Sequence, residues 1–271
     1  MSAPPPAPTP APAPTSAVAN VRHATQDGIA RVTLDSPPLN ILTRQVLTEL
    51  RTTFAALAAD ATLRVAVLSG AGQLFSAGAD VAEHLPPTWK AMIAEFLETV
   101  TELRAFPVPL IAAVRGRCLG GAFEIVQGAD LVVAGESATF GQPEILLGVI
   151  PPIACALLPG LAGPGRAAQI VFTGDAMNAA EALAAGLVAR VVPDDRVDAE
   201  AMALAGRIAR HSAAALRVAK RALRPPARER AEAEALSAAG RRYAKELMRC
   251  ADATEGLTAF IEKRQPTWTH R

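Results

Sequence analysis

The sequence has 271 residues, of which 51% are hydrophobic, enough apolar material to bury one sizeable core. The formal net charge of +1 comes from 27 Lys and Arg against 26 Asp and Glu, interspersed along the chain, which argues against a nucleic-acid-binding protein. No apolar run reaches the ~18 residues of a membrane-spanning helix, and the N-terminus lacks the charged start and apolar core of a signal peptide. We therefore expect a globular cytoplasmic protein that binds neither nucleic acid nor membranes.

Residues 1–17 form a Pro/Ala low-complexity segment, MSAPPPAPTPAPAPTSA. Proline fixes φ and lacks a backbone N–H, so this segment can neither pack nor hydrogen-bond as a regular element. We predict a disordered tail here, with ordered chain beginning near Val21.

The three cysteines, Cys118, Cys155 and Cys250, are too few and too scattered for a disulfide framework or a CxxC metal site. We predict three buried thiols and no metal site. His84 and Cys118 could be paired as base and nucleophile, but an unactivated buried cysteine is the commoner case.

The first predicted elements make a strand, helix, strand unit. Residues 29–34 alternate as a strand after an Asp27-Gly28 turn. Thr43 is a candidate N-cap for a helix to about residue 59, whose apolar positions recur at helical spacing. Residues 65–69 are almost continuously apolar, which predicts a strand buried on both faces.

The next segment is a glycine-containing loop at residues 70–80, GAGQLFSAGAD. It lacks the third glycine of a dinucleotide fingerprint, and nothing in the chain matches GxxxxGK[ST], so we discount nucleotide hydrolysis. The N–H groups that follow Gly78 and Gly120 suit an oxyanion better, as two donors at loop ends or helix starts. Residues 88–105 are predicted to form the next helix.

Two carboxylates stand in apolar surroundings between Gly116 and Gly148. Glu124 lies in a largely buried helix that begins at Gly121, after a predicted strand at residues 110–114. Glu144 follows the next predicted strand, residues 131–134, in an irregular loop before an apolar run. Two acids in such settings suggest acid/base catalysis, although a satisfied capping carboxylate with no chemical role is the alternative for each.

The last third of the chain is predicted to be mostly helical. Residues 176–187 indicate a helix, residues 188–192 a strand, and residues 198–263 further helices. A basic cluster of Lys220, Arg221 and Arg224 is expected on a polar helix face, where it would be solvated or meet another subunit rather than clamp a phosphate.

Several linked motifs, in the right order, resemble the enoyl-CoA hydratase/isomerase, or crotonase, superfamily. They are FSAGAD at 75–80, CLGGAFE at 118–124, FGQPEILLGVIP at 140–151, TGDAMNAAEALAAGLV at 173–188 and FIEKRQP at 260–266. The resemblance implies an α/β fold, a crotonase-type spiral of ββα units over residues 18–195, with a helical C-terminal oligomerisation region at 196–271. It also implies a homotrimer or a hexamer of paired trimers.

The resemblance further implies a catalytic site that needs no cofactor, because the coenzyme A thioester is itself the substrate. The backbone N–H groups of Ala79 and Gly121 would form the oxyanion hole for the thioester oxygen. Glu124 would assist as base, and Glu144 would be the main proton donor. Further residues matching substrate- or CoA-binding positions are Ala77, Gly78, Asp80, Pro152, Phe260 and Lys263, the last two reaching CoA from a neighbouring subunit's C-terminus.

One departure from the family pattern concerns the substrate. Residues 149–154 read VIPPIA where simple enoyl-CoA hydratases have a Gly-rich IPGxGG stretch, and Pro152 removes a backbone N–H there. Together with PPLNIL at 37–42, this resembles the branch that hydrates cyclohexa-1,5-diene-1-carbonyl-CoA. The alternatives are a double-bond isomerase, which needs only one acid/base, and a non-catalytic acyl-CoA- or RNA-binding relative.

Overall fold

The computed structural model describes residues 19–271, so the tail predicted at 1–17 lies outside the described residues. The main sheet is parallel except where β1 pairs antiparallel with β2. Its strand order is β1 (Val21–Gln26), β2 (Ile29–Leu34), β3 (Val65–Gly70), β4 (Leu110–Val114), β6 (Leu131–Gly135) and β9 (Arg190–Val192). A second, small sheet has the order β5 (Arg117–Leu119), β7 (Thr139–Gly141) and β8 (Met177–Asn178).

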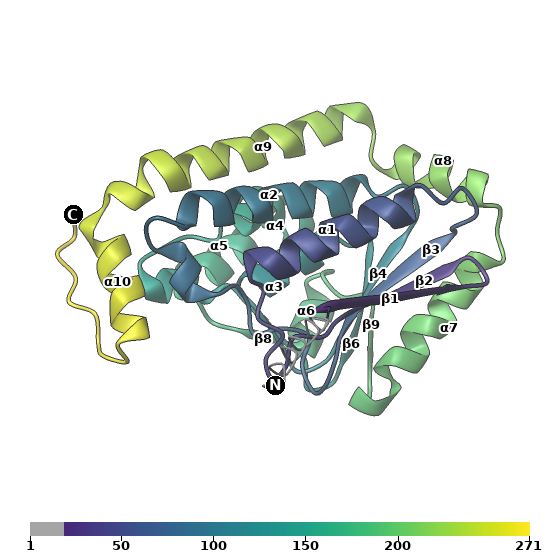
Figure 1. Ribbon diagram of the computed structural model, residues 1–271, viewed down its shortest axis with the longest axis horizontal. Helices are drawn as coiled ribbons and strands as arrows, with labels where there is room; N and C mark the ends of the chain where they lie inside the picture. Colours follow the sequence, from purple (N-terminus) through teal and green to yellow (C-terminus); the bar gives the residue numbers. More distant parts are fainter. Residues whose placement is uncertain (1–18) are drawn as a thin grey trace, which may run out of the picture.

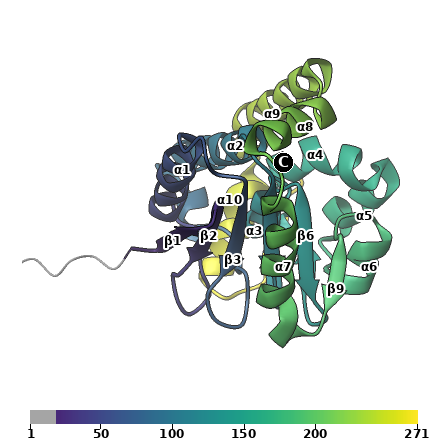
Figure 2. The ribbon, with the colours of Figure 1, turned by 90° about the vertical axis from the view of Figure 1, so that its right-hand side faces the viewer.

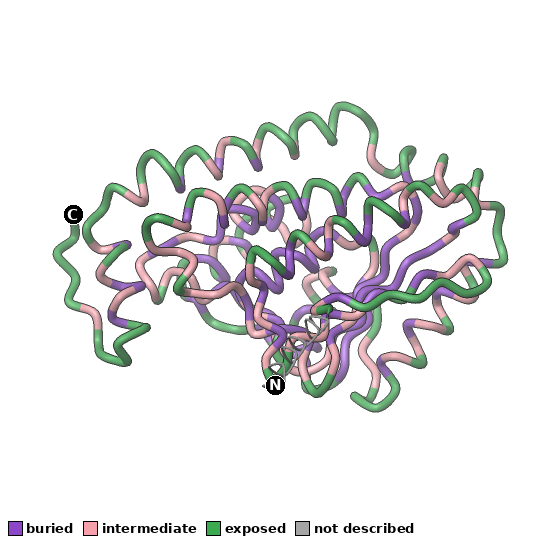
Figure 3. Tube along the Cα trace, in the orientation of Figure 1, coloured by how far each residue is buried: buried purple, intermediate pink, exposed green. Residues whose placement is uncertain are grey.

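Helices cover both faces of the main sheet, as Figure 2 shows from one end. On β3, Ala66 and Leu68 belong to the main core, whereas Val65 and Val67 pack with α7 (Val197–Ala209). This two-sided burial confirms the prediction for residues 65–69, and the central strands of Figure 3 are buried along most of their length. The sequence of a parallel strand is a nearly continuous apolar run because both faces of the strand are covered.

The first two helices pack side by side on one face of the sheet (Figure 1). They are α1 (Arg44–Ala58) and α2 (Trp89–Ala105). Thr43 caps α1 as predicted, because its Oγ1 accepts a hydrogen bond from the Val46 N–H at 3.3 Å.

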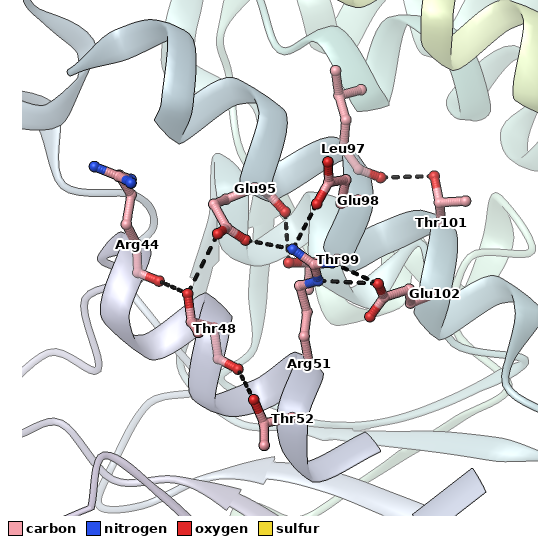
Figure 4. Close-up of polar contacts among 10 residues, drawn as sticks. All are labelled: Arg44, Thr48, Arg51, Thr52, Glu95, Leu97, Glu98, Thr99, Thr101 and Glu102. Atoms are coloured by element: carbon pink, nitrogen blue, oxygen red, sulfur yellow. Dashed lines mark hydrogen bonds and ion pairs between the residues drawn. The ribbon is translucent and has the colours of Figure 1, made fainter. Parts of the chain in front are cut away.

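A cluster of ion pairs joins the exposed sides of these two helices (Figure 4). Arg51 of α1 reaches three carboxylates of α2, Glu95 at 2.7 Å, Glu98 at 2.6 Å and Glu102 at 2.7 Å. Glu102, chiefly through its hydrogen bond, and Glu95 raise the pKa of Arg51. The cluster fixes α2 against α1, and α2 is one wall of the cavity described below.

Helices make up most of the rest of the chain, and no helix between residues 19 and 271 is long and apolar enough to cross a membrane. The α-helices are α3 (Gly121–Val126), α4 (Pro152–Ala162), α5 (Pro164–Thr173), α6 (Ala179–Ala184), α8 (Ala213–Leu223), α9 (Pro226–Lys245) and α10 (Ala251–Ile261). The 3-10 helices are η1 (Val81–His84), η2 (Pro143–Leu147), η3 (Asp194–Arg196) and η4 (Leu247–Arg249). Figure 1 shows α9 running along α2 and α10 turning back toward the core.

The segment predicted as one helix at 176–187 is shorter and begins differently. The chain first makes β8, and α6 starts only at Ala179 because Asn178 forms a capping box with Glu181. The strand predicted at 188–192 is correspondingly reduced to β9. The sequence analysis also missed β1, which the Asp27-Gly28 turn pairs with β2.

The predicted solvated basic cluster is wrong for Lys220. Its ammonium is buried, 2.6 Å from Asp130 Oδ2 and 3.0 Å from the Val108 carbonyl oxygen, so it fixes α8 to the loop before β6. Arg224 is half-buried and pairs with Glu232 at 2.7 Å. The partners of Lys220 lie 90 and 112 positions away in sequence, and a helical charge pattern does not reveal them.

The prediction of three buried thiols is correct only for Cys118. Cys155 is half-buried on α4, and Cys250 is exposed before α10. Cysteine is a small apolar residue as far as packing is concerned, so type alone did not distinguish these positions.

Candidate active site

A cavity of about 890 Å³ opens between the main core and the C-terminal helix. Its walls come from the loop before η1, η1 itself, α2, the start of α3, η2, the start of α4 and the end of α10. The lining is mostly apolar, and it also contains the carboxylates of Glu124 and Glu144. Such a cavity suits an organic ligand with a few polar groups.

Two chain segments run in parallel into the middle of this cavity. Ser76 donates its N–H to the Arg117 carbonyl at 3.1 Å, and Ser76 and Cys118 form an isolated parallel bridge. Three residues beyond this bridge on each segment, Ala79 and Gly121 are neighbours. A Cβ built on Gly121 would lie 3.3 Å from Ala79 Cβ.

Glycines with positive φ precede both of these residues and set the directions of their N–H groups. Gly78 has φ 112° and Gly120 has φ 54°, which side chains other than glycine rarely adopt. A Cβ at Gly78 would lie 2.8 Å from the Leu119 carbonyl oxygen, so the close approach of the two segments also requires glycine.

The two N–H groups are free to bind a ligand. Across residues 19–271, neither the Ala79 N–H nor the Gly121 N–H donates a hydrogen bond within the protein. Gly121 is the first residue of α3, where an N–H has no partner inside the helix. A pair of unsatisfied donors at one point of an apolar cavity can bind an oxygen that gains negative charge.

Glu124 is 4% exposed and points from α3 to the N-terminus of α4. Its Oε1 accepts hydrogen bonds from the Ile153 N–H at 2.8 Å and the Ala154 N–H at 3.0 Å. Burial raises the pKa of Glu124 to about 7, and these two N–H groups oppose the rise because they favour the carboxylate. Glu124 is therefore a buried acid whose ionised form is specifically stabilised.

Glu144 lies across from it on η2, with its carboxyl group next to Gly120. A Cβ on Gly120 would be 2.7 Å from Glu144 Oε1. Burial raises the pKa of Glu144 well above its usual value, and the negative charge of Glu124 raises it further. Since two close carboxylates cannot easily ionise together, Glu144 is the acid that retains a proton when Glu124 is charged.

A buried amide chain holds the Glu144 carboxyl group. In the amide orientation that satisfies both of its ends, Gln142 donates to Glu144 Oε1 and Oε2 at 3.2 and 3.1 Å. Its oxygen then accepts from Gln127 Nε2 at 3.1 Å, and both glutamines are buried. The sequence analysis missed these two residues, although two glutamines close to the acids in an apolar stretch were a visible signal.

The structure places the other predicted site residues as follows. Five of the six predicted substrate or CoA contacts line the cavity, and Lys263 does not. Those that line it are Ala77, Gly78, Asp80, Pro152 and Phe260.

Phe260 lines the cavity of its own chain, because α10 packs against η1 and η2. Gly148 and Gly256 make this contact possible. A Cβ on Gly256 would be 2.2 Å from the Leu147 carbonyl oxygen, and one on Gly148 would be 2.7 Å from that of Asp252. Two glycines spaced along a sequence do not indicate that they face each other.

The alternative Cys118–His84 pair is not formed. Cys118 is fully buried in the core, where desolvation raises the pKa of its thiol, and it makes no hydrogen bond to His84. His84 instead lines the cavity, with Nδ1 3.0 Å from the Asp80 carbonyl oxygen. Within residues 19–271, no three His, Cys, Asp or Glu side chains gather in a way that could hold a metal ion.

The α/β core, the helical C-terminal region and their arrangement are those of a crotonase-type fold, as predicted. Residues 24–271 match the family model described as enoyl-CoA hydratase/isomerase. This chain belongs to the enoyl-CoA hydratase/isomerase family, and the match includes every residue that lines the cavity.

Individual relatives agree with this assignment. A probable enoyl-CoA hydratase of Mycobacterium bovis is 40% identical over 247 residues, which cover 89% of this chain and 94% of that protein. A cyclohexa-1,5-dienecarbonyl-CoA hydratase of Thauera aromatica is 36% identical over 247 residues, covering 91% and 95% of the two chains. The crystal structure of an enoyl-CoA hydratase from Mycobacterium avium subsp. paratuberculosis has a TM-score of 0.80 and 32% identity, covering 93% of this chain and 99% of that one.

Proposed function

We propose that this protein adds water across the conjugated double bond of an acyl-CoA thioester. The observation that carries the proposal is the meeting, in one cavity, of two free backbone donors with two glutamates whose pKa values are raised and whose hydrogen-bond partners differ. Family membership supplies the thioester class, since the relatives are named as hydratases of CoA thioesters.

The proposed reaction assigns one step to each group. Glu124 takes a proton from water as the water oxygen bonds to the β carbon. Negative charge then moves to the thioester oxygen, where the Ala79 and Gly121 N–H groups each stabilise it by roughly 3 kcal/mol. Glu144 delivers a proton to the α carbon, so that H and OH have been added. Transfer of the proton from Glu124 to Glu144 then restores both acids, so that over the cycle one water supplies both the OH and the H.

Both pKa values are raised, and the different causes of the two shifts support this division of roles. The N–H groups of Ile153 and Ala154 favour the charged form of Glu124, as a base requires. Burial and the neighbouring charge keep Glu144 protonated, as an acid requires. A double-bond isomerase needs only one such group, so the presence of both favours hydration. The reaction needs no cofactor, because the thioester carbonyl accepts the electrons.

We also propose how the thioester lies in the cavity. The two parallel segments enter the cavity at Ala77 and Arg117. They then pass the Ala79 and Gly121 N–H groups and continue into η1 and α3. With the thioester oxygen at the donors and the β carbon at the glutamates, CoA lies on the side of Ala77, and the acyl group lies among η1, α2 and the start of α4. The named relative from Thauera aromatica and the proline at 152 together favour a cyclic dienoyl group.

The test is a spectrophotometric comparison of crotonyl-CoA and cyclohexa-1,5-diene-1-carbonyl-CoA as substrates. Loss of the enoyl or dienoyl absorbance, with a hydroxyacyl-CoA product seen by mass spectrometry, is the expected result. A product of unchanged mass with a moved double bond would identify an isomerase instead.

We further propose a homotrimer, or a pair of trimers. Large apolar side chains remain exposed on adjoining elements, Leu146 on η2, Phe172 on α5 and Leu183 on α6. Apolar surface of this kind is typical of an interface. Light scattering during size-exclusion chromatography should give three or six times the chain mass, and a monomer would contradict the proposal.

A further inference from the structure

Among the described residues 19–271, His84 is the one imidazole that lines the cavity, and the proposed reaction does not use it. It ends η1, five residues beyond the donor Ala79, and η1 packs against α2 and α10. It therefore lies on the acyl side of the proposed thioester position. The α2 side of this part of the lining is apolar, with Met92, Ile93 and Phe96, and Asp80, the N-cap of η1, is the charged group close to His84.

The hydrogen bond to Asp80 fixes the tautomer of His84. A carbonyl oxygen only accepts hydrogen bonds, so Nδ1, 3.0 Å from the Asp80 oxygen, must carry the proton. Desolvation lowers the pKa of His84, which favours the neutral ring. In a neutral ring with Nδ1 protonated, Nε2 has a lone pair and is an acceptor.

This Nε2 acceptor is still unused. Among residues 19–271 no donor lies within hydrogen-bonding distance of Nε2, and this atom is accessible to solvent. An acceptor on an otherwise apolar wall is satisfied by water when the cavity is empty. A fully apolar acyl group would displace that water without replacing its hydrogen bond.

We propose that His84 is a specificity residue that selects acyl-CoA thioesters whose acyl group, whether a ring or a chain, carries a hydroxyl beyond the β carbon. The inference rests on the proposed hydratase function and names the substrate class of the same site. A hydroxyl matches a lone neutral acceptor, since it donates one hydrogen bond and carries no charge to desolvate. A carboxylate does not match, because the lone pair of Nε2 would face its negative charge.

The experiment measures kcat/KM for hydration of trans-2-hexenoyl-CoA and of its 5-hydroxy and 6-hydroxy derivatives. The readout is the ratio of each hydroxylated substrate to the plain one, because overall losses of activity cancel in this ratio. The wild-type protein should favour one hydroxylated chain by roughly tenfold, the worth of one hydrogen bond inside an apolar site.

Substitutions at His84 then assign the preference to Nε2. His84→Leu should abolish the preference, and His84→Gln, whose amide oxygen reaches the region of Nε2, should restore part of it. His211→Leu replaces an exposed histidine beyond α7 and is the matched control, which should leave the ratio at the wild-type value.

Two results would overturn the inference. One is a wild-type protein that hydrates the plain chain as efficiently as both hydroxylated chains. The other is a preference that persists in His84→Leu. Failure of the proposed function is distinct, because the wild-type protein would then hydrate none of these three thioesters and neither crotonyl-CoA nor cyclohexa-1,5-diene-1-carbonyl-CoA.

Discussion

Glu124 accepts two backbone hydrogen bonds, whereas Glu144 faces the Gln142 amide and the charge of Glu124. The two side chains are chemically identical, so their different tendencies to ionise come entirely from these surroundings. The N-terminus of α4 stabilises one charge, and the nearness of that charge suppresses the second. At the scale of single residues, this difference is what separates a base from an acid.

The difference makes activity and stability respond to pH in predictable directions. Raising the pH through about 7 ionises Glu124 and should increase kcat/KM, and a further rise that removes the Glu144 proton should decrease it. Because the two acids influence each other's ionisation, the rising and falling parts of the pH profile report pKa values of the pair and not of either residue alone. A profile that is flat from about pH 5 to pH 9 would contradict the assignment.

The free energy of unfolding that this pair contributes, in contrast, should decrease steadily as the pH rises. Both carboxyls have a raised pKa when folded, so the folded protein holds more protons than the unfolded chain above about pH 4.5. The stability that the two carboxyl groups contribute is fully present below their pKa in the unfolded chain. It is lost as the pH rises through their pKa values in the folded protein. Thermal unfolding should therefore show Glu144→Gln gaining stability relative to wild type between about pH 5 and pH 8. If the difference in stability between Glu144→Gln and wild type is the same across this pH range, the pKa of Glu144 is not raised in the folded protein.

Pro152 provides a prediction about the acyl group. It is the first residue of α4, beside the two N–H groups that hold Glu124, and it lines the cavity. Its ring makes the wall rigid and apolar, which suits a flat ring better than a mobile chain. Pro152→Gly should narrow the preference for cyclohexa-1,5-diene-1-carbonyl-CoA over crotonyl-CoA in kcat/KM. If the preference exists and the variant keeps it unchanged, selectivity lies elsewhere in the cavity.

At the scale of elements, the position of α10 decides whether the cavity has a complete wall. The helix packs on η2 through Gly148 and Gly256 and carries Phe260 and Ile261 to the cavity. Neither glycine leaves room for a side chain, because the nearest atoms belong to backbone. Backbone atoms cannot move aside as a flexible side chain can.

Gly256→Ala should therefore lift α10 and weaken substrate binding. A Cβ at 2.2 Å from the Leu147 oxygen has to be relieved by a shift of the helix, so we expect KM to rise several-fold and stability to fall by about 1–3 kcal/mol. Gly206→Ala in α7 is the matched control. Nothing lies within 4 Å of its Cβ, and alanine in a helix should be neutral or stabilising. Equal effects of the two changes would show that α10 does not depend on this close contact.

At the scale of the whole molecule, the sequence predicted the order of the main elements and the fold class. Apolar runs such as residues 110–114 and the Thr43 cap are local signals, and local signals survive folding. The motifs placed Glu124 and Glu144 in one site before any geometry was known. Family resemblance, rather than periodicity, supplied that connection.

The contacts that sequence analysis missed join residues far apart in the chain. Lys220 meets Asp130 across 90 positions, and α10 reaches η2 through two glycines that face each other only in the folded chain. The single imidazole acceptor at His84 also became visible only when Nδ1 was seen bonded to Asp80. Such features depend on tertiary packing, and a periodic pattern carries no information about them.

The central claim is that Glu124 and Glu144 act together on an enoyl-CoA thioester. The measurement that tests it most directly is kcat for crotonyl-CoA hydration by wild type, Glu124→Gln, Glu144→Gln and the double variant, with thioester affinity measured alongside. Each single change keeps the side-chain shape and should reduce kcat by at least about 10², and the double change should cost far less than the product of the two, with affinity largely retained. Wild-type turnover in Glu144→Gln would contradict the account.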